Sequence, residues 1–306
     1  MQKSLKTEFL GRPITSPLVL SAGVMGMAFS GFNISIENGA GIVTSKSLTL
    51  EPRMGHKGPV VAEFEGGLLN CMGLCNPGIV DGLTEIDQFK KCSDIPIIAS
   101  VFATNTIDFL KLTSHVNKSK ADFLELNLSC PNVFDEFGIP LAASLEEVHN
   151  IVKAVKQISK FPVIAKLSPN VYDIVSIAKA AESAGADALC MINTVGPGML
   201  IDTKMVKPVL FNKFGGLSGS CIKPIALKLI YQTYSAVNIP IIGMGGVTYG
   251  EDAIEMLMAG AAVIGVGTAV HYRGIEVFNK INEEIFEFME ENGYKDLNNI
   301  PRLEKL

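Results

Sequence analysis

The 306-residue chain lacks the features that mark several large classes of protein. Its 26 basic residues form no run and are outnumbered by 31 acidic ones, giving a formal net charge of −5, which argues against a nucleic-acid-binding role. No apolar run approaches the ~20 residues of a membrane-spanning helix. Its six cysteines form no C-x-x-C pair, so no metal site or iron–sulfur cluster held by this chain alone is expected. These absences predict a cytoplasmic protein with reduced thiols.

What is present is an alternation of short apolar segments with amphipathic ones. The expected strands are Pro17–Ala22, Gly41–Ser47, Ile95–Val101, Asp122–Ser129, Phe161–Ser168, Ala188–Thr194, Ile239–Gly245 and Ala262–Thr268. The expected helices are Asp81–Lys91, Thr106–Asn117, Leu145–Ser159, Tyr172–Ala184, Ile222–Ala236, Glu251–Ala259 and Ile275–Glu290. This pattern predicts an α/β fold, a TIM (β/α)8 barrel, in a single domain spanning residues 1–306. The alternative, an open doubly wound sheet, lacks a G-x-G-x-x-G motif after its first strand.

Three connections are too long for ordinary strand-to-helix loops of a barrel. Segments 49–77, 131–143 and 195–220 follow the second, fourth and sixth expected strands. Because active sites of TIM barrels lie at the carboxyl ends of the strands, all three insertions are expected on the catalytic face.

The fourth expected strand ends in polar chemistry, with Asn127 followed by Cys130. A lone cysteine at a strand end is commonly a packing residue. Here its polar neighbours favour a chemical role, because a thiol with a pKa near ~8.5 can act as a general base close to neutral pH. The loop that begins at Pro131 could close over a ligand and exclude water.

Glycines and lysines at the other strand ends point to a bound anion. Gly245, Gly246, Gly267 and Thr268 end the last two strands, where barrels bind phosphate through backbone N–H groups. Lys46 and Lys166 interrupt apolar strands and would be costly to bury unpaired. An ammonium group at this mouth could stabilise a reduced flavin. The competing use of such a lysine is Schiff-base formation in an aldolase.

Three asparagines offer both a donor and an acceptor to a planar ring. Asn127 and Asn193 end strands, and Asn70 lies in the turn-rich segment LNCMGLCNPG, where Asn76 could equally satisfy its own backbone. The GGLSG segment at 215–219 would permit close approach to a flat ligand or form a flexible turn. The four histidines (56, 115, 149 and 271) are interpreted as surface or loop residues.

At these residues the chain resembles the catalytic subunits of dihydroorotate dehydrogenases along nearly its whole length. The motifs that carry the resemblance are ELNLSCPN (125–132), AKLSPNV (165–171), MINT (191–194), GGLSG (215–219), IKP (222–224) and IPIIGMGGV (239–247). SCPN is similar to the cysteine-based class 1 enzymes. KLSPNV together with AGADALCMINT resembles the NAD-linked class 1B.

The resemblance implies oxidation of dihydroorotate to orotate in pyrimidine biosynthesis by an FMN enzyme, with Cys130 as the base. It implies that the substrate contacts Lys46, Asn70, Gly73, Leu74, Asn127, Asn193 and Thr194. It implies that FMN contacts Ser21, Ala22, Lys46, Ser47, Asn127, Lys166, Ile192, Gly219, Gly245, Gly246, Gly267 and Thr268. It further implies a homodimer at the core of a heterotetramer, in which a second subunit carries FAD and a 2Fe–2S cluster and passes electrons to NAD.

The chain departs from the family pattern at two places. Ser100 stands where the family usually has an asparagine near FMN, and the segment VFDEFGIPLAA lacks the usual Gly-Gly pair. The alternatives are a fumarate-linked class 1A enzyme, a dihydropyrimidine (uracil or thymine) dehydrogenase module, a phosphate-binding aldolase and a non-catalytic binding subunit.

Overall fold

A closed barrel of parallel strands forms the centre of the molecule. The computed structural model describes residues 5–128 and 144–306. Within this part of the chain the barrel strands follow the order β10-β15-β16-β3-β4-β7-β8-β9. Their bounds are β3 (Leu18–Leu20), β4 (Ile42–Thr44), β7 (Ile97–Val101), β8 (Phe123–Asn127), β9 (Val163–Lys166), β10 (Ala188–Met191), β15 (Ile241–Met244) and β16 (Val263–Val266). Each lies inside the segment predicted for it, so the predicted TIM barrel is confirmed.

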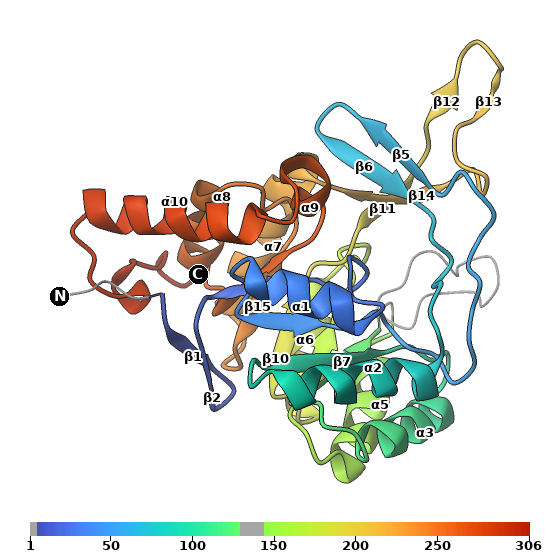
Figure 1. Ribbon diagram of the computed structural model, residues 1–306, viewed down its shortest axis with the longest axis horizontal. Coiled ribbons are helices and arrows are strands. Elements are labelled where there is room, and N and C mark those ends of the chain that lie inside the picture. The colour runs from blue at the N-terminus through green and yellow to red at the C-terminus, as the bar shows by residue number, and fades with distance from the viewer. Residues whose placement is uncertain (1–4, 129–143) are drawn as a thin grey trace.

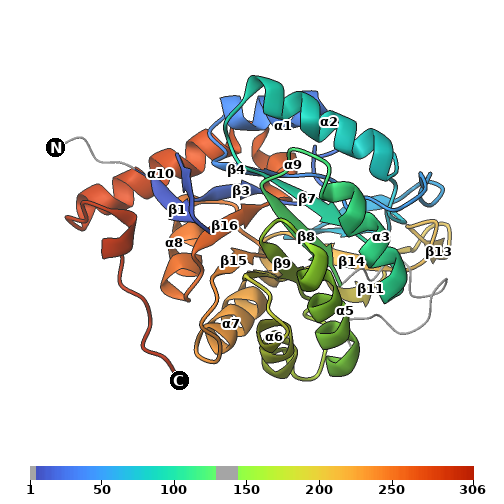
Figure 2. The same ribbon diagram turned by 90° about the horizontal axis from the view of Figure 1, so that it is seen from below.

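Helices surround the barrel, as Figure 2 shows. They are α1 (Phe29–Glu37), α2 (Ile79–Cys92), α3 (Thr106–Val116), α5 (Leu145–Ile158), α6 (Ile174–Ser183), α7 (Lys223–Tyr234), α8 (Gly250–Met258), α9 (Ala269–Arg273) and α10 (Val277–Glu291), with single 3-10 turns at η3 (Ser220–Ile222) and η4 (Leu297–Asn299). Ser144 caps α5 at its amino-terminal end, because its hydroxyl accepts from the Glu147 N–H at 3.2 Å. Helices α1 and α9 were not predicted. Of α1 only Phe32 and Ser35 are fully buried, so it shows no clear apolar periodicity.

A short hairpin, β1 (Thr7–Phe9) and β2 (Arg12–Ile14), packs against the amino-terminal end of the barrel. Phe9 lies edge-to-face against Phe123 of β8, with ring centroids 5.7 Å apart. Phe9 and Ile14 belong to the buried cluster that fills the barrel interior near this amino-terminal end. The sequence did not predict this hairpin, which closes the end of the barrel opposite the expected site.

Two of the predicted insertions join in one antiparallel sheet, here called the roof sheet. It consists of β5 (Val61–Phe64), β6 (Gly67–Asn70), β14 (Gly215–Ser218) and β11 (Val195–Gly198), in the order β11-β14-β6-β5. Figure 1 shows the blue β5–β6 hairpin beside β14 and β11, which come from much later in the chain. A smaller hairpin, β12 (Ile201–Asp202) and β13 (Lys207–Pro208), extends beyond it. The roof sheet covers the barrel mouth, on the face expected for the insertions.

Candidate active site

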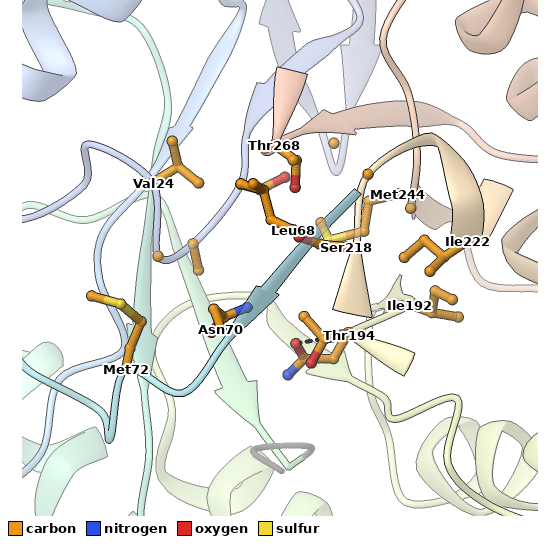
Figure 3. A pocket seen from close by; sticks show the side chains of 18 of the residues that line it. Val24, Leu68, Asn70, Met72, Ile192, Thr194, Ser218, Ile222, Met244 and Thr268 are labelled. Carbon is orange, nitrogen blue, oxygen red and sulfur yellow. Dashed lines mark hydrogen bonds between the residues drawn. The ribbon is translucent and has the colours of Figure 1, made fainter. Parts of the chain in front are cut away.

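A cavity of about 290 Å³ lies between the barrel mouth and the roof sheet. Its floor comes from the carboxyl ends of the barrel strands, and Leu68 and Asn70 of β6 face it from the roof. Figure 3 shows β6 crossing the cavity, with Thr268 and Thr194 on different sides of it. The cavity is therefore closed by chain segments from both halves of the sequence.

The structure brings nearly all of the predicted site residues to this one cavity. The predicted site residues that line it are Ser21, Ala22, Lys46, Ser47, Asn70, Leu74, Asn127, Lys166, Ile192, Asn193, Thr194, Gly219, Gly245, Gly246, Gly267 and Thr268. Cys130, the predicted base, lies outside the described residues. Ser100, where the chain departs from the family pattern, is fully buried and does not line the cavity.

Gly73 is the one described member of the predicted set that does not line the cavity. Its φ is +66°, and a Cβ at this position would lie 2.6 Å from the backbone nitrogen of His56. A side chain is thus excluded by packing within the turn that carries the neighbouring Leu74. Gly73 shapes the loop rather than the cavity wall.

The glycines after β15 and β16 form an open backbone cradle. Gly246 has φ +83°, and a Cβ there would lie 2.7 Å from the Cβ of Lys223. At Gly267 a Cβ would meet only Ser21 and Val24, at 3.6 Å or more, so it would fill cavity space. Among the hydrogen bonds of the described residues, none uses the N–H of Gly246, Gly267 or Thr268. Such unused donors favour an anionic group at this place.

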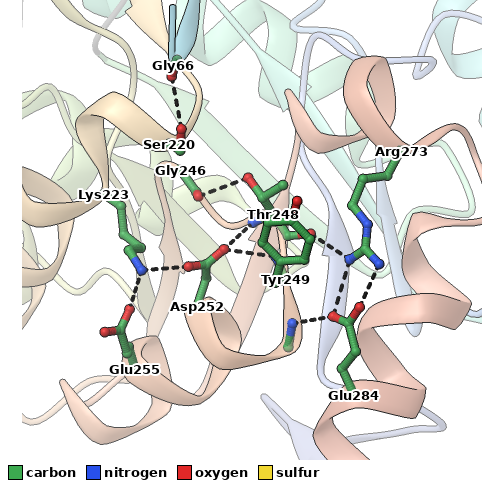
Figure 4. Close-up of polar contacts among 11 residues, drawn as sticks. Gly66, Ser220, Lys223, Gly246, Thr248, Tyr249, Asp252, Glu255, Arg273 and Glu284 are labelled. Carbon is green, nitrogen blue, oxygen red and sulfur yellow. Dashed lines mark hydrogen bonds and ion pairs between the residues drawn. The ribbon is translucent and has the colours of Figure 1, made fainter.

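A polar network behind the cradle fixes its shape, as Figure 4 shows. The Asp252 carboxylate accepts from the backbone N–H groups of Thr248 and Tyr249, each at 2.8 Å, and pairs with Lys223 at 2.6 Å. Lys223 also pairs with Glu255 at 2.6 Å. Burial alone would lower the pKa of Lys223, but its hydrogen bonds with Asp252 and Glu255 raise the pKa above its ordinary value. The loop after β15 is therefore held from outside the barrel.

Replacing Asp252 with alanine is expected to destabilise the fold by about 3 kcal/mol, because it leaves two backbone donors and a half-buried ammonium without their partner. Urea unfolding followed by circular dichroism measures this loss. Asp108→Ala serves as the control, since Asp108 pairs with Lys111 on the surface at 2.8 Å. The control should change stability by less than ~1 kcal/mol. Equal losses in the two variants would contradict the supporting role of Asp252.

The three predicted asparagines reach the cavity from different elements, and each is held by the backbone or a hydroxyl. The Asn70 side chain donates to the Gly216 carbonyl at 3.3 Å, and Asn127 donates to the Ser47 hydroxyl at 2.9 Å. The Asn193 side-chain oxygen accepts from the Thr194 N–H at 2.8 Å. By contrast Asn76, buried below the roof, bonds only to its own loop, as its alternative interpretation predicted.

The GGLSG segment is a strand rather than a turn. Gly215 and Gly216 belong to β14, and a Cβ at Gly216 would lie 2.2 Å from the hydroxyl of Thr194. The interpretation as a flexible turn is therefore wrong for Gly216, and the close approach of its backbone to a flat ligand stays a prediction. Glycine is needed there so that β14 can pack closely on the Thr194 side chain.

Two buried hydroxyls beside the cavity have no hydrogen-bond partner among the described residues, namely those of Ser21 and Thr194. A buried polar atom is costly unless it is paired. With the open cradle and the two lysines, these atoms fit a ligand that carries a phosphate and a polar ring. The residues present therefore fit FMN.

A second thiol lies below the cavity but is unsuited to be a base. Cys190 on β10 is fully buried, and its register partner on β9 is Lys166. Burial raises the pKa of the Cys190 thiol well above its usual range; Glu125 raises it further and Lys166 opposes the change. Cys190 therefore stays protonated at neutral pH. Another thiol, that of Cys71, packs in the apolar cluster of the roof sheet.

Several cavity residues were missed from the sequence. Leu68 and Met72 flank Asn70 at a spacing of two, the pattern of one face of a strand, which could have indicated β6. His271 was expected at the surface; its side chain is about half exposed, but it also lines the cavity. Met244 and Ser218 also line the cavity; each lies in a motif that carries the resemblance, but neither was assigned a role.

Across residues 5–128 and 144–306, none of the helices combines the length and the apolar character that crossing a bilayer requires. The same residues contain no cluster of three or more His, Cys, Asp or Glu side chains placed to hold a metal ion.

Comparison with known proteins agrees with this site. The family model described as dihydroorotate dehydrogenase matches residues 4–289. A protein of Methanocaldococcus jannaschii named dihydroorotate dehydrogenase B (NAD(+)), catalytic subunit, is 42% identical over 290 residues, 94% of each chain. A protein of Brachyspira hyodysenteriae with the same name is 42% identical over 298 residues, 97% of each chain. The chain belongs to the dihydroorotate dehydrogenase family of oxidoreductases.

Proposed function

We propose that the chain oxidises dihydroorotate to orotate with bound FMN, and that the cavity under the roof sheet is the active site. The observation that carries the proposal is the convergence of three carboxamides and two lysines on one cavity with an open glycine cradle. The relatives named as dihydroorotate dehydrogenase B catalytic subunits support the same substrate. FMN, when bound, would accept the hydride that leaves the substrate.

In this proposal the cradle residues Gly245, Gly246, Gly267 and Thr268 hold the phosphate through their backbone. Lys166 and Lys46 place positive charge beside the ring, and Lys166 is only 5% exposed, so water screens its charge weakly. The side chains of Asn70, Asn127, Asn193 and Thr194 hold the planar substrate by its alternating donors and acceptors. Cys130 removes a carbon-bound proton from the substrate as a general base.

The test is reduction of the enzyme-bound flavin by two related substrates under anaerobic conditions. Dihydroorotate carries a carboxylate and dihydrouracil does not, so the lysines favour dihydroorotate. We expect dihydroorotate to remove the visible flavin absorption rapidly and dihydrouracil to do so poorly. The opposite preference would support the dihydropyrimidine dehydrogenase alternative. A purified protein without flavin absorption would contradict the proposal and favour the aldolase or the binding subunit.

We further propose that a separate subunit with FAD and a 2Fe–2S cluster carries electrons from this chain to NAD, around a homodimeric core. The relatives named as catalytic subunits support a separate electron-transfer subunit. The isolated chain should therefore reduce its own flavin with dihydroorotate but reduce NAD only slowly. Rapid NAD reduction without a partner would contradict this arrangement, and rapid fumarate reduction would favour the class 1A alternative.

A further inference from the structure

A series of side-chain hydrogen bonds, here called the relay, leads from the cavity into the barrel interior and ends on a buried carboxylate. The Asn127 side chain donates to the Ser47 hydroxyl at 2.9 Å, the hydroxyls of Ser47 and Ser100 lie 3.0 Å apart, and Ser100 donates to Glu125 at 2.7 Å. Asn127 and Ser47 line the cavity, whereas Ser100 and Glu125 lie below it and are at most 1% exposed. Glu125 therefore does not touch a ligand.

The strand register explains why these residues meet. Glu125 and Asn127 are two apart on β8, so both face the barrel interior. Ser100 of β7 is the register partner of Glu125. The segment after β4 runs alongside, since the Leu48 N–H donates to the Ser100 carbonyl at 2.9 Å. The relay is thus built from two neighbouring strands, β7 and β8, and the segment that follows β4.

The donors at its two ends give this series of hydrogen bonds one direction. Each serine hydroxyl carries one proton, and that of Ser100 is directed to Glu125. Ser47 must then donate to Ser100, which leaves the Ser47 oxygen to accept from Asn127. The structure thus differs from the reverse arrangement, in which Ser47 would donate to the Asn127 oxygen.

We propose that Glu125 is a positioning residue that, through Ser100 and Ser47, fixes which edge of the Asn127 amide is offered to the substrate. With its nitrogen turned to Ser47, Asn127 presents its oxygen as an acceptor for a ring N–H. A rotated amide would present a donor to the same N–H and repel it. This inference rests on the proposed function, because it concerns how the same cavity recognises a pyrimidine ring through hydrogen bonds.

The test is a double-mutant cycle that reverses the direction of the hydrogen bonds in the relay. Asn127→Asp places an acceptor where Ser47 needs a donor, and Glu125→Gln alone removes the constraint on direction. In the double variant the glutamine amide can donate to Ser100, Ser100 to Ser47, and Ser47 to the new carboxylate, so every group is paired again. The second carboxylate oxygen remains an acceptor for the ring N–H.

Orotate affinity is measured by titration of the FMN-loaded protein, with the melting temperature of each variant recorded. We expect each single variant to bind orotate less tightly, and the double variant to bind about tenfold more tightly than Asn127→Asp alone. A role limited to fold stability would give additive losses, which would overturn the proposal. If the wild-type protein does not bind orotate, the proposed function fails instead.

Two further variants keep the inference testable if Glu125→Gln does not fold. Ser100→Ala removes the acceptor of the Ser47 proton, so Ser47 can donate to residue 127 instead, and Asn127→Asp should cost much less affinity in this background than in the wild type. Ser45→Ala is the matched control, because the buried Ser45 hydroxyl accepts from the Ser100 N–H at 3.0 Å but lies outside the relay. In the control background Asn127→Asp should keep its full cost. An equal cost in both backgrounds would refute the directional role of Glu125.

Discussion

Replacing Cys130 with alanine is expected to leave FMN bound and to lower turnover by about 10²–10⁴-fold, the usual contribution of a general base. The substitution leaves unchanged the cradle residues and the two lysines that would hold the cofactor. Stopped-flow reduction of the flavin by dihydroorotate measures the loss, and the ratio of flavin to protein shows that the cofactor stays bound.

Cys92→Ala is the control for this variant, because Cys92 is an exposed free thiol at the end of α2. It should reduce flavin at the wild-type rate. The wild-type rate should also rise between pH 6 and 9, as a thiol with an ordinary pKa near ~8.5 loses its proton. A Cys130→Ala variant at full rate, or a flat pH profile, would contradict the assignment of the base.

Replacing Gly246 with alanine is expected to weaken FMN binding by at least about tenfold, because the cradle must move. The φ of +83° at Gly246 costs a non-glycine residue ~1–2 kcal/mol, and this strain favours a changed backbone. The added Cβ would also lie 2.7 Å from the Lys223 Cβ and 2.9 Å from the Gly219 carbonyl oxygen. The cradle must move to relieve these contacts, which displaces its unused N–H groups. The dissociation constant of FMN is measured from the fluorescence of the free flavin.

Gly293→Ala separates backbone strain from loss of the cradle. Gly293 has a similar φ of +72°, but a Cβ there would meet no atom within 4 Å, and the residue does not line the cavity. This variant should lose a similar amount of stability to strain and keep its affinity for FMN. If Gly246→Ala also retained FMN normally, the cradle would not be the phosphate site.

The barrel and most of the cavity floor could be predicted because both depend on local sequence. Apolar runs mark parallel strands, and the ends of such strands meet at one mouth, so the sequence alone predicts that Lys166, Asn127 and Thr268 lie together. The roof sheet could not be predicted in this way. Its central pairing, Asn70 with Gly216, joins residues far apart in the chain, and no local periodicity specifies it.

Two other features were missed for different reasons. Helix α1 buries too few apolar side chains to show a helical period. Glu125 carried a usable signal, because a carboxylate inside an otherwise apolar strand is as unusual as the lysines that were noticed. Its partner Ser100 departs from the family pattern, and the structure places the two in direct contact.

The roof sheet also affects the order in which the protein can mature on the ribosome. Its β5–β6 hairpin is made early, but β14 and β11 leave the ribosome only after most of the barrel strands have been synthesised. Domains fold as units once their chain is available, so Asn70 has no strand neighbour in β14 until that late segment arrives. A nascent chain arrested before residue 215 would therefore hold part of the barrel without a completed binding pocket. The protein can therefore bind a ligand in this pocket only late in its synthesis.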